Sequence, residues 1–289
     1  MNAPKLTAIF SFTLIISCAG NPFGESEISA PDRVLSGRVR LDESASTAGV
    51  YVWLEGFNLS TWSDQTGRFK LELPPGQAGG GSVSGIFKLY YYLANYDLKT
   101  TDILVRDGVV LQPQPALDAE GELLQPVNLR EKLKIDTAIQ PNSLSNSRIR
   151  VVAGKTNFLL KVEVSIQATR GPVVVFFPKA VNSVVAPVIF KNTKTGESKV
   201  IASTIAGIGE TDIATIDRLP HIRTLAVPLF PDELIPGDYE IIPYLLIKDP
   251  DIPDRLLESL GSNVLELGDG YLKVPFVRQG SHRLLHVQQ

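Results

Sequence analysis

Apolar and polar residues alternate with a period of two along much of the chain, which is typical of half-buried β-strands. The alternation is clear in three segments, at residues 34–41, 50–54 and 158–166. Residues 173–177 are continuously apolar, which favours a central strand covered on both faces. The strongest helical signal is at residues 253–261, a short stretch that begins with Pro253 and ends with Gly261. We therefore predict an all-β chain with one short helix.

Turn-rich segments divide this pattern into two β-sandwich domains. The first covers residues 33–115 and ends in the sequence Gln112-Pro113-Gln114-Pro115. A linker follows at residues 116–147, and the second domain, which includes the short helix, covers residues 148–277. Residues 278–289 form a tail that we expect to be loose.

Short motifs in the first domain resemble the carboxypeptidase regulatory-like domain, a small transthyretin-like β-sandwich. The matching segments, in order, are Gly37-Arg38-Val39, Gly49-Val50-Tyr51-Val52, Ser63-Asp64-Gln65-Thr66-Gly67-Arg68-Phe69, Pro75-Gly76 and Val105-Arg106-Asp107-Gly108-Val109. Asn95-Tyr96 stands where the family has Gly-Tyr, so we expect a left-handed backbone at Asn95. In the signature segment, we expect Asp64 to cap the backbone and Gly67 to have a positive φ. The resemblance implies an accessory domain without catalysis.

The second domain resembles immunoglobulin-like sandwiches in its architecture. Tyr239 ends the sequence Leu234-Ile235-Pro236-Gly237-Asp238-Tyr239, which resembles the corner where a tyrosine hydroxyl bonds back to the backbone. Residues 192–197 predict a hairpin turn. A final hairpin is expected at residues 264–277, around Gly268-Asp269-Gly270.

Cys18 is the only cysteine of the chain, and it ends a short apolar run. One lysine, the apolar run and a small residue precede it, which predicts a signal peptide at residues 1–17. Ile15-Ile16-Ser17-Cys18 also resembles the lipobox of bacterial lipoproteins. That resemblance implies cleavage before Cys18 and attachment of lipid, palmitate included, to its sulfur and new amino group. Residues 18–32 are polar and contain Gly and Pro, which predicts a flexible tether.

Two other interpretations of the N-terminus are weaker. A transmembrane helix needs about 20 apolar residues, and residues 6–16 supply roughly half of them. In an ordinary secreted protein, Cys18 would have no partner in its own chain and would be open to oxidation. Acylation accounts for both the position and the isolation of this cysteine.

Charge and composition exclude several classes of partner. The formal net charge is −3, and the chain has no basic block or basic-aromatic stripe. Nucleic-acid binding and electrostatic docking on anionic lipid are therefore disfavoured.

Candidate catalytic and metal-binding groups are few. The histidines are His221, His282 and His286, and their surroundings predict neither a metal site nor a catalytic group. Asp249, Asp251 and Asp254 could ligate calcium, but their spacing lacks the turn glycine and final glutamate of known loops. We expect no cofactor, no metal and no catalytic residue.

Aromatic residues of the first domain offer the best candidate ligand site. Tyr90 and Tyr92 share one face of a predicted strand, and Trp53 and Tyr51 share one face of another. If exposed with Trp62, these rings would form a platform that stacks on sugar rings. The alternative is that they belong to the core.

The sequence thus predicts a lipid-anchored protein of the cell envelope with a non-catalytic binding or scaffolding role. The alternatives are a carbohydrate-binding surface lipoprotein and a component of a surface or secretion assembly that uses a sheet edge. The expected partners are the membrane, through the lipid, and other envelope proteins or glycans. Ala19 after Cys18 favours the outer membrane, by analogy with enteric bacteria.

Overall fold

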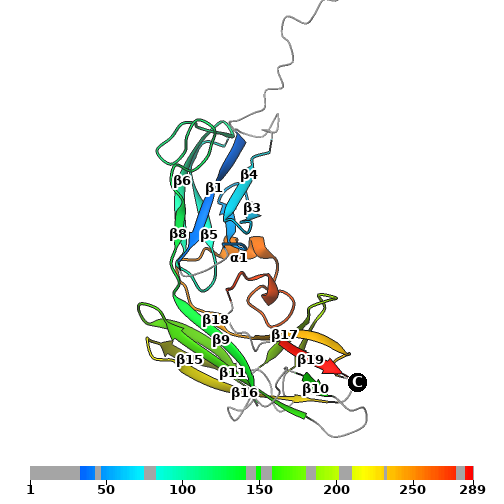
Figure 1. The fold of residues 1–289 in the computed structure, drawn as a ribbon. Coiled ribbons are helices and arrows are strands. Elements are labelled where there is room, and N and C mark those ends of the chain that lie inside the picture. Colours follow the sequence, from blue (N-terminus) through cyan, green and yellow to red (C-terminus); the bar gives the residue numbers. More distant parts are fainter. Residues whose placement is uncertain are drawn as a thin grey trace, which may run out of the picture. The chain divides into compact units, whose positions relative to one another are not determined.

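Nearly every regular element of the structure is a β-strand, so the predicted fold class of two successive β-sandwiches is confirmed (Figure 1). The computed structural model describes residues 33–42, 47–74, 83–140, 148–150, 158–179, 187–201, 210–230, 233–277 and 284–288. The described residues belong to one compact unit, residues 32–289, and residues 1–31 lie outside the described residues.

The first sandwich consists of two sheets. One has the order β4 (Arg68–Glu72), β1 (Val34–Leu41) and β8 (Val127–Leu129). The other has the order β3 (Leu59–Trp62), β2 (Tyr51–Leu54), β5 (Gly85–Tyr92), β6 (Lys99–Arg106) and β7 (Val109–Val110). Alternate residues of β1, β2 and β5 face the core between the sheets, where Leu35, Val52 and Tyr91 are fully buried.

The second sandwich consists of three sheets around one core. One has the order β16 (His221–Leu229), β11 (Phe158–Ala168) and β9 (Leu133–Gln140). Another has the order β15 (Glu210–Ile216), β12 (Val173–Lys179) and β18 (Leu246–Ile247). The last has the order β10 (Arg148–Arg150), β19 (Leu284–Gln288), β17 (Gly237–Pro243), β13 (Val188–Asn192) and β14 (Ser198–Ile201). Val162, Phe190 and Leu285, one from each of three strands, are fully buried in this core.

The expected linker and tail contain strands instead. β8 lies within residues 116–147 and pairs in parallel with β1, and β9 lies there too and pairs with β11. In the expected tail, β19 pairs with both β10 and β17. β8 was missed because it is too short to show alternation, and β19 because it follows a polar stretch. β9 does alternate, with Leu133, Ile135, Thr137 and Ile139 buried, but it runs directly into the turn-rich segment that follows. The chain therefore passes from one sandwich to the other near residue 131.

The helix prediction is confirmed, and the final hairpin prediction is wrong. α1 (Asp254–Leu260) begins after Pro253 and ends before Gly261, and it buries Leu256 and Leu260. Residues 264–277 contain turns and the 3-10 helix η2 (Tyr271–Lys273) rather than two strands. Val264, Tyr271 and Val274 are buried by packing against other elements, so burial without strand pairing produced the misleading pattern.

Predicted turn chemistry is confirmed at three positions. The Tyr239 hydroxyl donates to the Ile235 carbonyl at 2.9 Å, as expected for a tyrosine corner. Strands β13 and β14 form the predicted hairpin, in which Gly196 has a φ of 76°. In the first sandwich, Gly67 has a φ of 79°, and Asp64 Oδ1 accepts hydrogen bonds from the backbone N–H groups of Thr66 at 2.7 Å and Arg68 at 2.9 Å.

The Asp64 turn predicts a pH-dependent contribution to stability. The Thr66 hydroxyl and the Arg68 backbone N–H hold the pKa of the Asp64 carboxyl below its ordinary value of 3.8. Because these bonds favour the ionised form, the stabilisation is present above the unfolded-state pKa and is lost as pH falls through the lower folded-state pKa. We expect Asp64→Asn to unfold at lower urea than the wild type at neutral pH, with the difference closing below about pH 4. Asp136→Asn, at an exposed position of β9, is the control whose difference from the wild type stays small and constant. A pH-independent difference for Asp64→Asn would contradict the prediction.

Candidate functional site

Of the residues considered for an exposed aromatic platform, Tyr51, Trp53, Tyr90 and Tyr92 are instead buried in a third core, which we call the junction cluster, and Trp62 alone is exposed, at 47%. The buried members of the junction cluster are Tyr51, Trp53, Tyr90, Tyr92, Ala94, Ile189, Ile242, Tyr244, Leu256, Leu260, Val264, Tyr271 and Val274. They come from β2 and β5 of the first sandwich, from β13 and β17 of the second, and from α1 and the coil that follows it. β2 and the second half of β5 are therefore buried on both faces.

The correction is clearest for the three residues named as candidate ligand contacts. The exposed fractions of Trp53, Tyr90 and Tyr92 are 1%, 8% and 3%. The rings of Trp53 and Tyr90 lie against each other, with centroids 5.5 Å apart. Burial raises the pKa of Tyr92, and the charge of Asp249 raises it further. A sugar ring has no face to stack on at these positions, so the ground for a platform there is lost.

Hydrogen bonds hold α1 and the coil that follows it against the aromatic residues of β2 and β5. The Tyr51 hydroxyl lies 2.8 Å from the Ser259 hydroxyl of α1. The Tyr271 hydroxyl donates to the Leu245 carbonyl at 2.7 Å, and the Tyr244 hydroxyl donates to the Leu265 carbonyl at 2.5 Å. The hydroxyls of Tyr51, Tyr244 and Tyr271 thus have polar partners, which lets these aromatic side chains fill the core with their polar atoms satisfied.

Asn95 is a positioning residue whose role the sequence did not reveal. Its side-chain amide donates to the Val277 carbonyl at 2.9 Å and accepts from the Val277 N–H at 3.0 Å. The residue is fully buried, and it is not among the residues with positive φ, so the expected left-handed conformation is wrong. An asparagine is needed here because its amide matches a backbone N–H and C=O simultaneously.

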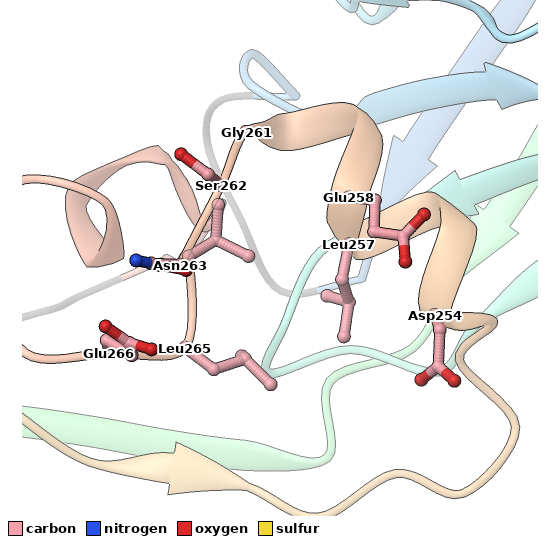
Figure 2. A pocket seen from close by; sticks show the side chains of 9 residues that line it. Asp254, Leu257, Glu258, Gly261, Ser262, Asn263, Leu265 and Glu266 are labelled. Carbon is pink, nitrogen blue, oxygen red and sulfur yellow. The ribbon is translucent and has the colours of Figure 1, made fainter.

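Two hollows flank α1. The larger, about 570 Å³, has side chains of α1 on one side and of the following coil on the other, as Figure 2 shows. Its lining includes the carboxylates of Asp254, Glu258 and Glu266 together with Leu257 and Leu265, and no histidine, lysine or arginine. It is an acidic, partly open groove, without a paired nucleophile and base.

The smaller hollow, about 290 Å³, lies between α1 and the turn that joins β2 to β3. Arg255, Glu258 and Ser259 line it from the helix, and Trp53 and Asn58 line it from the hairpin. The Trp53 indole N–H donates to Asn58 Oδ1 at 3.2 Å, so this polar atom is used inside the protein. The hollow therefore offers mainly the exposed charges of α1 to a ligand.

The remaining candidate groups make structural contacts. Arg223 Nε donates to His221 Nε2 at 3.2 Å, and His286 Nδ1 contacts Asp238 Oδ1. Asp249 pairs with Lys132 instead of standing open to calcium. Within the described ranges, no three His, Cys, Asp or Glu side chains gather in a metal-binding arrangement, and no helix is long and apolar enough to cross a membrane. Cys18 and His282 lie outside the described residues.

Comparisons with known proteins give only weak structural matches. No family model and no curated protein matches the chain. Among solved structures, it is similar to BcpA, the major pilin subunit of Bacillus cereus, with 13% identity over 75% of this chain and 66% of that chain and a TM-score of 0.27. It is similar to the RrgB pilus protein of Streptococcus pneumoniae, with 9% identity over 74% of this chain and 48% of that chain and a TM-score of 0.27. It is also similar to the Bacillus anthracis TIE protein, with 11% identity over 88% of this chain and 34% of that chain and a TM-score of 0.22. The chain spans less than two thirds of each of these structures, and at such TM-scores the likeness carries no functional argument.

Proposed function

We propose that this chain is a lipid-anchored protein of the cell envelope with a non-catalytic scaffolding or binding role. The anchor is the acylated Cys18, and residues 18–32 tether the body to the membrane surface. Ala19 supports the outer membrane as the site of attachment. Several acyl chains on one residue would make membrane binding stable, since a single chain binds only marginally.

The observation that carries the scaffolding role is the junction cluster. The sequence predicted a linker between the two domains, but a buried aromatic core joins the two sandwiches, which belong to one compact unit. We infer that this core fixes the position of one sandwich relative to the other. Larger buried apolar interfaces between modules suppress relative motion. The polar groups within this cluster are engaged in structural hydrogen bonds, as for Tyr51 and Tyr271. Such a rigid body suits a protein that acts as a spacer or that holds another molecule at a fixed distance from the membrane.

Metabolic labelling tests the anchor. Cells expressing the full chain are fed an alkyne analogue of palmitate, and the purified protein is assayed for label and for recovery with membranes. We expect the wild type to be labelled and membrane-bound and Cys18→Ala to be unlabelled. Ser17→Ala, which keeps a small residue before the cysteine, is the matched control and should be labelled. An unlabelled wild-type protein would overturn the lipid anchor.

Of the alternatives, carbohydrate binding loses its platform because Trp53, Tyr90 and Tyr92 are buried. A role in a surface or secretion assembly is favoured by a specific observation. The second sandwich has long edge strands with apolar exposed positions, and assemblies use such edges for strand addition.

A further inference from the structure

The outer face of the sheet β4-β1-β8 gathers four cations from two separate strands. Alternate residues of β1 and β4 are buried in the core of the first sandwich, and the residues between them point away from it. The exposed cations among these outward residues are Arg38 and Arg40 in β1 and Arg68 and Lys70 in β4, and we call them the basic face. Because each alternates with a buried residue, the sequence shows no basic block and disfavoured electrostatic docking on lipid.

The strand register places two of these cations directly opposite each other. Arg38 pairs with Arg68 in the antiparallel ladder of β1 and β4, a position in which like charges are destabilising. In the other described strand pairs no two residues of like charge are directly opposed, and Lys88, for example, stands opposite Asp102. The arginine pair is therefore suited to an outside anion that contacts both guanidinium groups.

Acidic residues of the protein do not neutralise the basic face. In the part of the chain that the structure describes, none of its four side chains forms an ion pair. Arg38 Nε donates to the Thr66 carbonyl at 2.9 Å, which fixes the position of that guanidinium. The charge of Arg68 contributes to the low pKa of Asp64, but Asp64 Oδ1 is already engaged by backbone N–H groups. The cations are thus available to an outside partner.

Other acidic residues of this sheet lie toward its ends or have partners of their own. Glu72 and Glu122 lie beside the first three residues of β1. Asp42, just after the strand, pairs with Arg170 at 3.0 Å. Three of the four cations lie between these positions, so the middle of the face is positive.

The basic face directly follows the segment that we propose as the tether. That segment covers residues 18–32, and β1 begins at Val34. About 15 coil residues have a root-mean-square reach of roughly 20 Å. With a rise of about 3.4 Å per residue, Arg38 and Arg40 lie roughly 14 and 20 Å along β1 from Val34. The face therefore lies within reach of the membrane surface to which the tether leads.

We propose that the basic face docks on the anionic headgroups of the membrane that carries the lipid anchor. This inference rests on the proposed function, because the tether keeps the face close to that surface and raises its effective concentration there. Headgroup phosphates match guanidinium groups, which bind them through two parallel hydrogen bonds. Docking would fix the orientation of the first sandwich on the bilayer, which a flexible tether alone does not do.

Fluorescence quenching in vesicles tests the docking. The full lipidated chain with Asn128→Cys, at an exposed position opposite Arg40, is labelled there with a fluorophore. It is reconstituted into phosphatidylcholine vesicles with a headgroup-attached quencher, with or without phosphatidylglycerol. We expect phosphatidylglycerol to increase quenching and high salt to remove the increase, because salt screens exposed charges. Vesicle-bound protein without this increase, or with an increase that salt leaves intact, overturns the proposal.

Two double variants identify the surface involved. Arg38→Gln with Arg68→Gln removes the opposed cations, and Lys134→Gln with Lys161→Gln removes equal charge from exposed positions of β9 and β11. Each cation near an anionic surface strengthens binding by roughly fivefold, so the arginine variant should dock roughly 25-fold more weakly and lose the increase in quenching. The lysine variant is the control and should behave as the wild type. Equal losses in both variants would reflect net charge alone and contradict the proposal.

The same samples separate the docking from the anchor. Recovery of protein with the vesicles measures the anchor, and quenching measures the docking. Protein that is recovered but does not respond to phosphatidylglycerol retains the anchor and rejects the docking, whereas wild-type protein that is not recovered overturns both. The arginine variant should fold, because it removes a like-charge pair. If circular dichroism shows that it does not, the salt dependence of the wild type still decides.

Discussion

Trp53→Ala is expected to lower the free energy of unfolding by about 3–5 kcal/mol, which is the range for removing a large buried aromatic side chain. Trp53 is 1% exposed, and it belongs to the junction cluster, where its ring lies against that of Tyr90. Its loss removes buried apolar area and leaves a cavity between β2 and α1. The measurement is urea unfolding followed by far-ultraviolet circular dichroism.

The chain supplies its own control for this variant. Trp62, the only other tryptophan, is 47% exposed and contacts Tyr51 with ring centroids 4.9 Å apart. Trp62→Ala should cost about 1 kcal/mol, the value of a partly exposed aromatic pair. If the two variants were equally destabilised, or if Trp53→Ala had no effect, the junction cluster would not hold the body together.

The second large effect is expected at the ion pair of Lys132 and Asp249. Their side chains are 20% and 8% exposed, and Asp249 Oδ1 also accepts from the Asp251 N–H at 3.1 Å. Lys132→Met leaves the buried carboxylate without its cation, which typically costs about 3–5 kcal/mol. The free energy of unfolding from urea titration measures the loss.

A double variant distinguishes two contributions to the loss of stability: the loss of the attraction between the two charges, and the cost of leaving one buried charge without a partner. Replacing both partners, as in Lys132→Met with Asp249→Leu, should recover most of the stability, since apolar groups can replace a buried pair at little cost. Arg170→Ala is the matched exposed case. Arg170 bridges Asp42 at 3.0 Å and Asp97 at 3.3 Å, and its loss should cost about 1 kcal/mol or less. A double variant no more stable than Lys132→Met would contradict this explanation.

Local patterns predicted the faces of strands well. Alternation assigned Val52 and Leu54 to one face of β2 and Tyr51 and Trp53 to the other, and the two pairs lie in different cores. The turn at Asp64 and the corner at Tyr239 were also predictable, because their hydrogen bonds join residues within four positions of one another. Interactions between residues this close in the chain can be predicted from a short stretch of sequence.

Which faces meet solvent was not predictable in the same way. Tyr51 is covered through Ser259, a residue 208 positions later in the chain, and no local pattern indicates that contact. The same holds for Asn95, whose partner Val277 is 182 positions away. A strand face with aromatic residues has the same local sequence pattern whether it stays exposed or is covered by a distant helix. The sequence therefore left both interpretations open for Trp53, Tyr90 and Tyr92.

The central claim is that the junction cluster makes one stiff body of the two sandwiches. Differential scanning calorimetry of the full chain tests it most directly. The claim predicts a single unfolding transition whose calorimetric and van't Hoff enthalpies agree. Two separate transitions, with the buried Trp53 becoming exposed at the first while one sandwich remains folded, would contradict it.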